Sequence, residues 1–257
     1  MNARLTVLGS GTSMGVPTIG CDCAVCHSPD PHDRRTRPSV LIEYDGHAVL
    51  IDTTPDFREQ AIRENIRKLD AVLYTHTHAD HILGIDDLRP ISFLHTPNKL
   101  PLYARPDAAE FLRTMFRYIF EAKYKFGSLP EVELRPMDET LDLFGALFEP
   151  VPVIHGDMEI YGFRFGSAAY LTDHSEIPER SFAKLQGLDI LFLDALRHKP
   201  HPTHSTIENS LRIVERVKPQ RAFFTHICHD LPHEATNAAL PPNVRLSYDG
   251  MKLDFDI

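Results

Sequence analysis

The chain has 257 residues, of which 42% are hydrophobic and 25% charged, as is typical of a globular protein with a packed core. Its formal net charge of −9 at pH 7 argues against non-specific electrostatic binding of nucleic acid or anionic lipid. No apolar run approaches the length that crosses a bilayer, and the N-terminus lacks the apolar segment of a signal peptide, so we expect a cytoplasmic protein with no membrane partner.

Short apolar or alternating runs, separated by turn residues, predict strands interleaved with helices. In the first half we expect a strand at 5–8, a glycine-rich turn at 9–15, a hairpin of strands 40–44 and 48–51, a helix at 56–67, a strand at 70–75, a helix beginning near Asp86 and a longer helix at 107–122. In the second half we expect strands near 131–135, 146–153, 159–165, 168–172, 189–193 and 221–225, a helix at 206–217 capped by Ser205 with Glu208, and two C-terminal strands. Because no low-complexity linker divides the chain, we predict a single domain over residues 1–257, of the α+β class, with two β-rich halves packed sheet on sheet and helices outside.

The strongest chemical signal is the run Thr-His-Thr-His-Ala-Asp-His at residues 75–81, directly after an apolar strand. Alternation at a strand end points His76 and His78 the same way, so both imidazoles can bind one metal ion. Asp80 and His81 follow one step further along and can serve a second ion. Four such side chains in six residues would be a poor way to build a core, because each would need a buried partner.

The H-x-H-x-D-H pattern resembles the signature of the metallo-β-lactamase superfamily, which implies a four-layer αββα sandwich and two divalent ions. The other motif residues of that family are matched in the family's order, each after a predicted strand: Asp52 as a support for the ligands, then His155, Asp173 and His226. The resemblance implies one ion held by His76, His78 and His155, another held by Asp80, His81 and His226, and Asp173 shared by both. It also counts Asp80 among the catalytic residues. Such ligands suit zinc, manganese or iron, and their spacing does not choose among these metals.

A second cluster of metal-ligand type is the C-x-C-x-x-C run of Cys21, Cys23 and Cys26. It resembles the PhnP-like phosphodiesterase group, in which a cysteine-rich loop, here about residues 20–38, is clipped by a structural zinc ion to the segment carrying the last active-site histidine. The resemblance makes His229 the fourth ligand, with Cys228 as a rival. Reduced thiols without a metal remain the alternative.

The His-Ser-Thr triplet at residues 204–206 resembles that of PhnP-like phosphodiesterases and of tRNA 3′-processing endonucleases, which implies that His204 is a general acid or a phosphate ligand. His201 is the lower-ranked candidate, and a helix-capping loop with an incidental histidine is the alternative. The basic run 34–37 is usually a solvated surface loop, and the alternative is that Arg35 and Arg37 form a phosphate clamp. The turn at 9–15 lacks the Lys-Ser/Thr of a nucleotide-binding loop and is expected to line the metal cleft.

The leading hypothesis is a metal-dependent hydrolase, a phosphodiesterase that cleaves a small or cyclic phosphodiester with a metal-bound hydroxide. A tRNA 3′-processing endonuclease is the alternative, but the net negative charge disfavours it. Such enzymes hold tRNA with a basic, glycine-rich arm, and the only segment that could form one, residues 107–130, has mixed charge and reads as a compact helix. Thioester or lactone hydrolysis uses the same ligands, and a non-catalytic binding or sensing module would usually have lost some of them. We expect a small-molecule substrate and no nucleic-acid partner, and the sequence is compatible with a homodimer.

Overall fold

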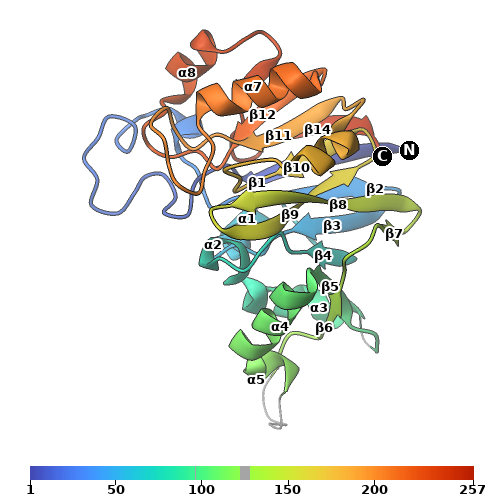
Figure 1. Cartoon of the computed structure of the whole chain (residues 1–257). Helices are drawn as coiled ribbons and strands as arrows, with labels where there is room; N and C mark the ends of the chain where they lie inside the picture. The colour runs from blue at the N-terminus through green and yellow to red at the C-terminus, as the bar shows by residue number, and fades with distance from the viewer. Residues whose placement is uncertain (96, 122–127) are drawn as a thin grey trace.

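Two seven-stranded sheets form the centre of the molecule, seen in the computed structural model of Figure 1, which describes residues 1–95, 97–121 and 128–257. The first sheet has the order β14 (Lys252–Asp256), β1 (Asn2–Gly9), β2 (Ser39–Tyr44), β3 (His47–Ile51), β4 (Ala71–Leu73), β5 (Leu100–Ala104) and β6 (Val132–Pro136). The second has the order β13 (Val244–Leu246), β12 (Arg221–Thr225), β11 (Ile190–Asp194), β10 (Ala168–Leu171), β9 (Met158–Phe165), β8 (Ala146–His155) and β7 (Leu141–Leu143).

The inner faces of the two sheets share one hydrophobic core, in which Leu5 and Val40 of the first sheet join Phe163 and Phe192 of the second. Outside the first sheet lie α1 (Phe57–Arg63), α2 (Ala79–Ile82), α3 (Arg89–Ser92), α4 (Pro106–Met115) and α5 (Arg117–Phe120). Outside the second lie α6 (Glu179–Phe182), α7 (Ile207–Val217) and α8 (His233–Ala239). The layers run helix, sheet, sheet, helix, so the predicted αββα sandwich is confirmed.

The parallel strands explain why some apolar runs do not alternate. β11 pairs in parallel with β10 and β12, and its side chains are buried on both faces. Phe192 faces the core between the sheets, whereas Leu191 and Leu193 face the helices. A continuous apolar run is what such a two-sided environment selects.

The chain ends meet at the edge of the first sheet. β14 pairs antiparallel with β1, and the Met1 amino group donates a hydrogen bond of 2.9 Å to the Ile257 carbonyl. The two termini accordingly lie side by side in Figure 1. The last strand therefore completes the sheet formed by the first half of the chain.

The predicted hairpin is confirmed, since β2 and β3 are antiparallel and join through Asp45 and Gly46. Both turn residues have positive φ, 45° and 76°, as a two-residue turn of this kind requires. Two strands, β5 and β7, are not predicted by the sequence pattern. In β5, buried and half-buried residues do alternate, but Pro101 obscured the pattern because proline is uncommon inside strands.

Several helix boundaries differ from the prediction. The helix expected at 56–67 ends at Arg63, the one near Asp86 is a 3₁₀ turn at Ile85–Leu88, and the one expected at 107–122 breaks at Phe116, with residue 122 outside the described residues. The described ranges contain no helix that is both long and apolar enough to cross a membrane.

The cap of α7 was also assigned one residue too early. Thr206 is the N-cap, and its hydroxyl accepts a hydrogen bond of 3.2 Å from the Asn209 backbone N–H. The Ser205 hydroxyl lies 2.7 Å from that of Ser210 instead, so Glu208 does not complete a capping box with Ser205.

Candidate metal centre

The candidate ligands lie where strands of both sheets end. His76 and His78 follow β4, Asp80 and His81 lie in the short helix α2, and His155 is the last residue of β8. Beyond β10 and β12, Asp173 and His226 have positive φ, 51° and 57°, as does Asp52 after β3, at 65°. Few residues other than glycine adopt this conformation, although aspartate and histidine are among the more tolerant. Non-glycine residues in this conformation cluster at functional sites.

One group consists of His76, His78, His155 and Asp173, each offering one ligand atom within 4.8 Å of the others. The His155 Nε2 atom lies 3.2 Å from His78 Nδ1, and His76 Nε2 lies 3.9 Å from Asp173 Oδ2. His78 is exposed whereas the other three are buried, so this group opens to solvent on the side of His78.

The second group consists of Asp80, His81, Asp173 and His226, all buried, with ligand atoms again within 4.8 Å. The His81 Nε2 atom lies 3.3 Å from both Asp80 Oδ2 and Asp173 Oδ1. The His226 Nε2 atom lies 3.2 Å from Asp173 Oδ2. Asp173 belongs to both groups, which is the position that the family resemblance implied for it.

These residues fit a cation. Among the described residues, the Nε2 atoms of His76, His81 and His226 are buried without a hydrogen-bond partner, as is Asp80 Oδ2. Buried polar atoms are rarely left without a partner, so several unpaired lone pairs directed at one point indicate a binding site for a cation. The charges agree: burial alone would lower the pKa of His226, but Asp173 and Asp80 raise it to about 9. Carboxylates that stabilise a positive charge here would equally stabilise a metal ion, and the mixture of imidazole and carboxylate suits first-row transition metals.

Two of the candidate ligands, His81 and His155, are oriented by contacts to their Nδ1 atoms. The Nδ1 atom of His81 lies 2.7 Å from Asp52 Oδ2, and Asp52 also accepts hydrogen bonds from the Thr75 backbone N–H and hydroxyl. The Nδ1 atom of His155 lies 2.7 Å from the Thr203 carbonyl. Such contacts set the tautomer, so that Nε2 of each ring is left with a lone pair directed into the centre. Asp52 thus has the contacts expected of a supporting residue.

His204 lies against the centre: its ring stacks on that of His226, with centroids 4.5 Å apart, and meets the ring of His155 edge-on, with centroids 4.7 Å apart. Its Nδ1 atom lies 2.6 Å from Oδ2 of Asp194, a fully buried residue at the end of β11. Sequence reasoning missed Asp194, although a polar residue closing an apolar strand is the same signal that singled out Asp52. His201 is engaged by Thr203, whose backbone N–H lies 3.3 Å from its Nδ1.

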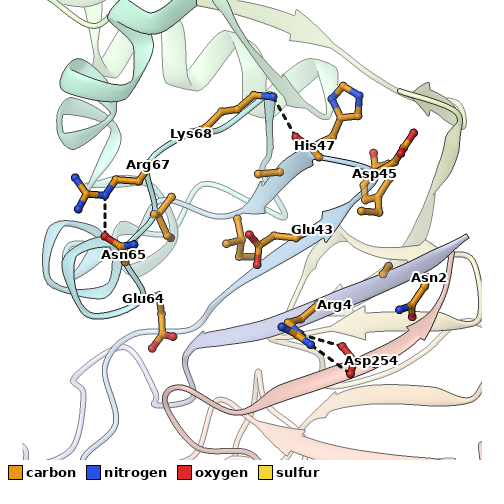
Figure 2. Close-up of a pocket in the computed structure, with 16 residues that line it drawn as sticks. Asn2, Arg4, Glu43, Asp45, His47, Glu64, Asn65, Arg67, Lys68 and Asp254 are labelled. Atoms are coloured by element: carbon orange, nitrogen blue, oxygen red, sulfur yellow. Dashed lines mark hydrogen bonds and ion pairs between the residues drawn. The ribbon is translucent and has the colours of Figure 1, made fainter.

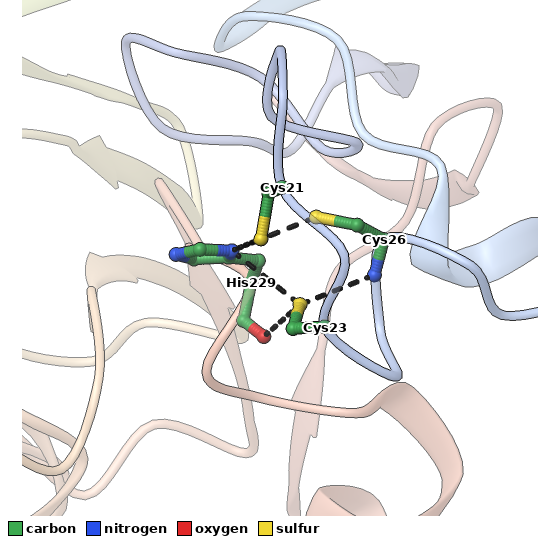
Figure 3. A group of neighbouring side chains, drawn as sticks. All are labelled: Cys21, Cys23, Cys26 and His229. Carbon is green, nitrogen blue, oxygen red and sulfur yellow. Dashed lines mark hydrogen bonds between the residues drawn. The ribbon is translucent and has the colours of Figure 1, made fainter.

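The cysteine loop meets the segment after β12, as Figure 3 shows. The Nδ1 atom of His229 lies 3.1 Å from Cys21 Sγ and 3.5 Å from both Cys23 Sγ and Cys26 Sγ. The Cys26 backbone N–H donates to Cys23 Sγ and lowers the pKa of that thiol to about 6, which favours the thiolate that metals bind. Cys228 is buried outside this group, so the geometry favours His229 over Cys228 as the fourth ligand.

The structure contradicts the predicted role of Arg35 as a phosphate clamp. Its side chain is fully buried, pairs with Asp33 at 2.8 Å, and donates hydrogen bonds of 2.9 and 2.7 Å to the carbonyls of Cys228 and Leu231. It anchors the cysteine loop to the segment after His226 and has no face for a substrate. Arg37 pairs with Asp56 at 2.9 Å and donates to the Ser13 carbonyl, so much of its hydrogen-bonding capacity is used within the protein.

The glycine-rich turn packs against the segment that carries the last histidine. The Ile227 backbone N–H donates to the Ser10 carbonyl at 2.9 Å, and the Thr12 N–H donates to the Ile227 carbonyl at 3.1 Å. A Cβ atom on Gly11 would lie 2.7 Å from the Arg35 carbonyl oxygen, so only glycine fits. The turn therefore supports one wall of the centre, next to His226.

Two pockets lie at very different places. A groove of about 340 Å³ begins at His76 and Thr77 and runs between Arg105, Phe111 and Met158. A larger pocket of about 500 Å³, shown in Figure 2, lies beside β1 and β2 and is lined by charged residues that include the Arg4–Asp254 ion pair. None of the seven residues of the metal centre lines the larger pocket, so the groove at His76 is the candidate substrate site.

The fold and the histidine–aspartate cluster define a hydrolase of the metallo-β-lactamase type. A family model described as the beta-lactamase superfamily domain matches residues 47–227, and the chain belongs to this superfamily. Within it the chain belongs to the PhnP family: it is 62% identical to a solved structure described as a new diphosphatase from that family, covering 99% of this chain and 98% of that one, with a TM-score of 0.94.

More distant relatives share the fold or parts of the sequence. PqqB of Methylobacterium extorquens, solved with bound Zn²⁺, is 20% identical, with a TM-score of 0.80 over 98% of this chain and 100% of that one. An octanoyltransferase of Porphyromonas gingivalis is 38% identical over 98% of this chain and 52% of its own length. A ribonuclease Z of Bradyrhizobium diazoefficiens is 30% identical over 54% of this chain and 47% of its own length. The chain thus spans about half the length of these two relatives.

Proposed function

We propose that this hydrolase uses two divalent ions, zinc or manganese, to act as a phosphoric diester hydrolase on a small phosphodiester, or alternatively to cleave the P–O–P anhydride bridge of a diphosphate. The observation that carries this proposal is the Asp194–His204 pair, which places an oriented proton donor directly beside the seven candidate ligands. The 62% identity to a structure described as a diphosphatase of the PhnP family supports a phosphate-containing substrate.

The residues divide the work as follows. His76, His78 and His155 would hold one ion, Asp80, His81 and His226 the other, and Asp173 would reach both. Bound there, the two ions would supply Lewis-acid stabilisation for the charge on the phosphoryl oxygens. Asp52 keeps the Nε2 lone pair of His81 directed inward.

His204 would act on the leaving group. Asp194 engages its Nδ1, which leaves Nε2 as the atom that delivers a proton to the departing oxygen. The exposed edge at His78 and the groove that begins at His76 give a phosphate ester a way into the centre. Phe111 and Met158 line that groove with apolar surface for the organic part of a small substrate.

The proposal is tested by loading the purified chain with Mn²⁺ or Zn²⁺ and measuring turnover of bis(p-nitrophenyl) phosphate, a cyclic phosphodiester and a diphosphate diester. We expect turnover of at least one of them, and its loss in His226→Asn. The control is His198→Gln, which removes an exposed histidine paired with Glu208 outside the cluster. Inactivity of the metal-loaded chain on all three esters would refute the proposal.

Parallel assays on a precursor tRNA and on a fatty acyl thioester separate the alternatives suggested by the two curated relatives. Because each relative is matched over about half its length, its name can describe a part that has no counterpart here. The net charge of −9 also opposes tight binding of a polyanion. Cleavage of tRNA or thioester with phosphodiesters untouched would replace the proposal by the corresponding alternative.

A further inference from the structure

A third cluster of metal-ligand type lies outside both sites described above. It joins the cysteine-rich loop to the start of α8 and consists of His32, His233 and Glu234. His32 belongs to a 3₁₀ turn at Pro31–Asp33, six residues beyond Cys26 and far in sequence from α8. None of the three belongs to the metal centre or to the Cys21–Cys23–Cys26–His229 group.

The ligand atoms of this cluster converge as they do in the metal centre. Each of the three side chains offers one ligand atom, and these atoms lie within 4.8 Å of one another. The Nδ1 atoms of His32 and His233 are buried and, within the described residues, have no hydrogen-bond partner. His233 is only 4% exposed, so an unpaired ring nitrogen there is costly unless something binds it.

The surroundings favour a neutral imidazole at His233, with a carboxylate nearby at Asp30. Burial lowers the pKa of His233 to about 4, which leaves its ring neutral and its lone pair available near neutral pH. Asp30 adds a carboxylate oxygen 3.6 Å from His32 Nδ1. The nearby cation Arg35 is already compensated by its ion pair with Asp33. Contact with the tilted ring of Tyr248, with ring centroids 4.1 Å apart, helps to fix the orientation of His32.

We propose that His32, His233 and Glu234 form an additional binding site for a divalent transition-metal ion of the zinc type. Two imidazoles with one carboxylate are a ligand set for zinc and its neighbours in the transition series, whereas Mg²⁺ and Ca²⁺ prefer all-oxygen sites. Glu234 is exposed, so the ion exchanges with solvent and water completes its coordination. A bound ion would tether the cysteine loop to α8, in parallel with the Arg35 anchor and the Cys–His group.

Zinc binding tests the site without reference to catalysis. The full-length chain is titrated with buffered free Zn²⁺, and bound ions are counted by native mass spectrometry. We expect the wild type to take up one ion more than His32→Gln or Glu234→Gln at the same free zinc, or to reach that count at a concentration lower by about tenfold or more. Glu215→Gln, the same change at an exposed position of α7, is the matched control and should behave as the wild type.

A second readout is thermal unfolding, because a ligand that binds only the folded state raises Tm. Zinc added beyond the amount that fills the tighter sites should raise the Tm of the wild type and of Glu215→Gln, but not that of Glu234→Gln. Since Glu234 is exposed, its amide variant is expected to fold normally. Equal ion counts and equal Tm shifts in all variants would mean adventitious surface binding only and would overturn the proposal, as would the absence of an extra ion in the wild type.

Discussion

Replacing Asp194 by asparagine tests how His204 is used. Asp194 is fully buried, and its Oδ2 lies 2.6 Å from His204 Nδ1. A hydrogen bond that involves a charged group contributes about 1.5–3 kcal/mol. Because about 1.4 kcal/mol corresponds to a factor of ten in rate, Asp194→Asn should lower kcat by about 10- to 150-fold where proton delivery limits turnover. KM should change little, since Asp194 is buried behind His204.

The assay compares two diesters that share a phosphate but differ in leaving group. An alkoxide needs a proton to depart, whereas p-nitrophenolate does not, so the loss should appear with the alkyl ester and be small with the aryl ester. Asp189→Asn is the control, because it makes the same change just before the opposite end of β11, where Asp189 accepts a hydrogen bond from Gln220. Equal losses on both esters would refute the reasoning, since they would mean a general structural effect.

Three further variants test the supporting structure. Asp52→Asn should weaken active-site metal binding by about 10- to 100-fold, measured by competition with a chelating dye, because it disturbs the inward orientation of His81; unchanged affinity would contradict this. Arg35→Leu should lower the free energy of unfolding by about 3–5 kcal/mol in urea denaturation, since it leaves Asp33 buried without its ion-pair partner; a loss below about 1 kcal/mol would argue against the anchor. Cys26→Ser should reduce bound zinc by one ion per chain and expose the cysteine loop to proteolysis, and an unchanged zinc content would count against the clip.

The candidate metal centre was accessible from sequence because its signals are local. His76, His78, Asp80 and His81 lie within six consecutive positions after one strand, so backbone geometry alone brings them together. His155, Asp173 and His226 each end or follow an apolar strand, and the family resemblance supplied their order. The same rule points to Asp194, which is the last residue of the apolar strand β11.

Other assignments depended on contacts that no local pattern encodes. Arg35 sits in a basic run that suggests exposure, yet the loop folds inward and buries it against the carbonyls of Cys228 and Leu231. The family resemblance named His229 as the fourth ligand with Cys228 as a rival, and the tertiary contacts bring His229 to the three cysteines. Pro101 hid a strand whose pairing with its neighbours outweighs a weak local preference.

By itself the sequence determined the fold class, the family and the chemistry of the ligands, because periodicity and short motifs depend on neighbours along the chain. Only the tertiary structure decided which distant segments come into contact: Arg35 with the carbonyls of Cys228 and Leu231, and His32 with His233. Those contacts form because loops that are far apart in the sequence pack against one another. Packing is a property of the whole core, and a local stretch of sequence carries little information about it.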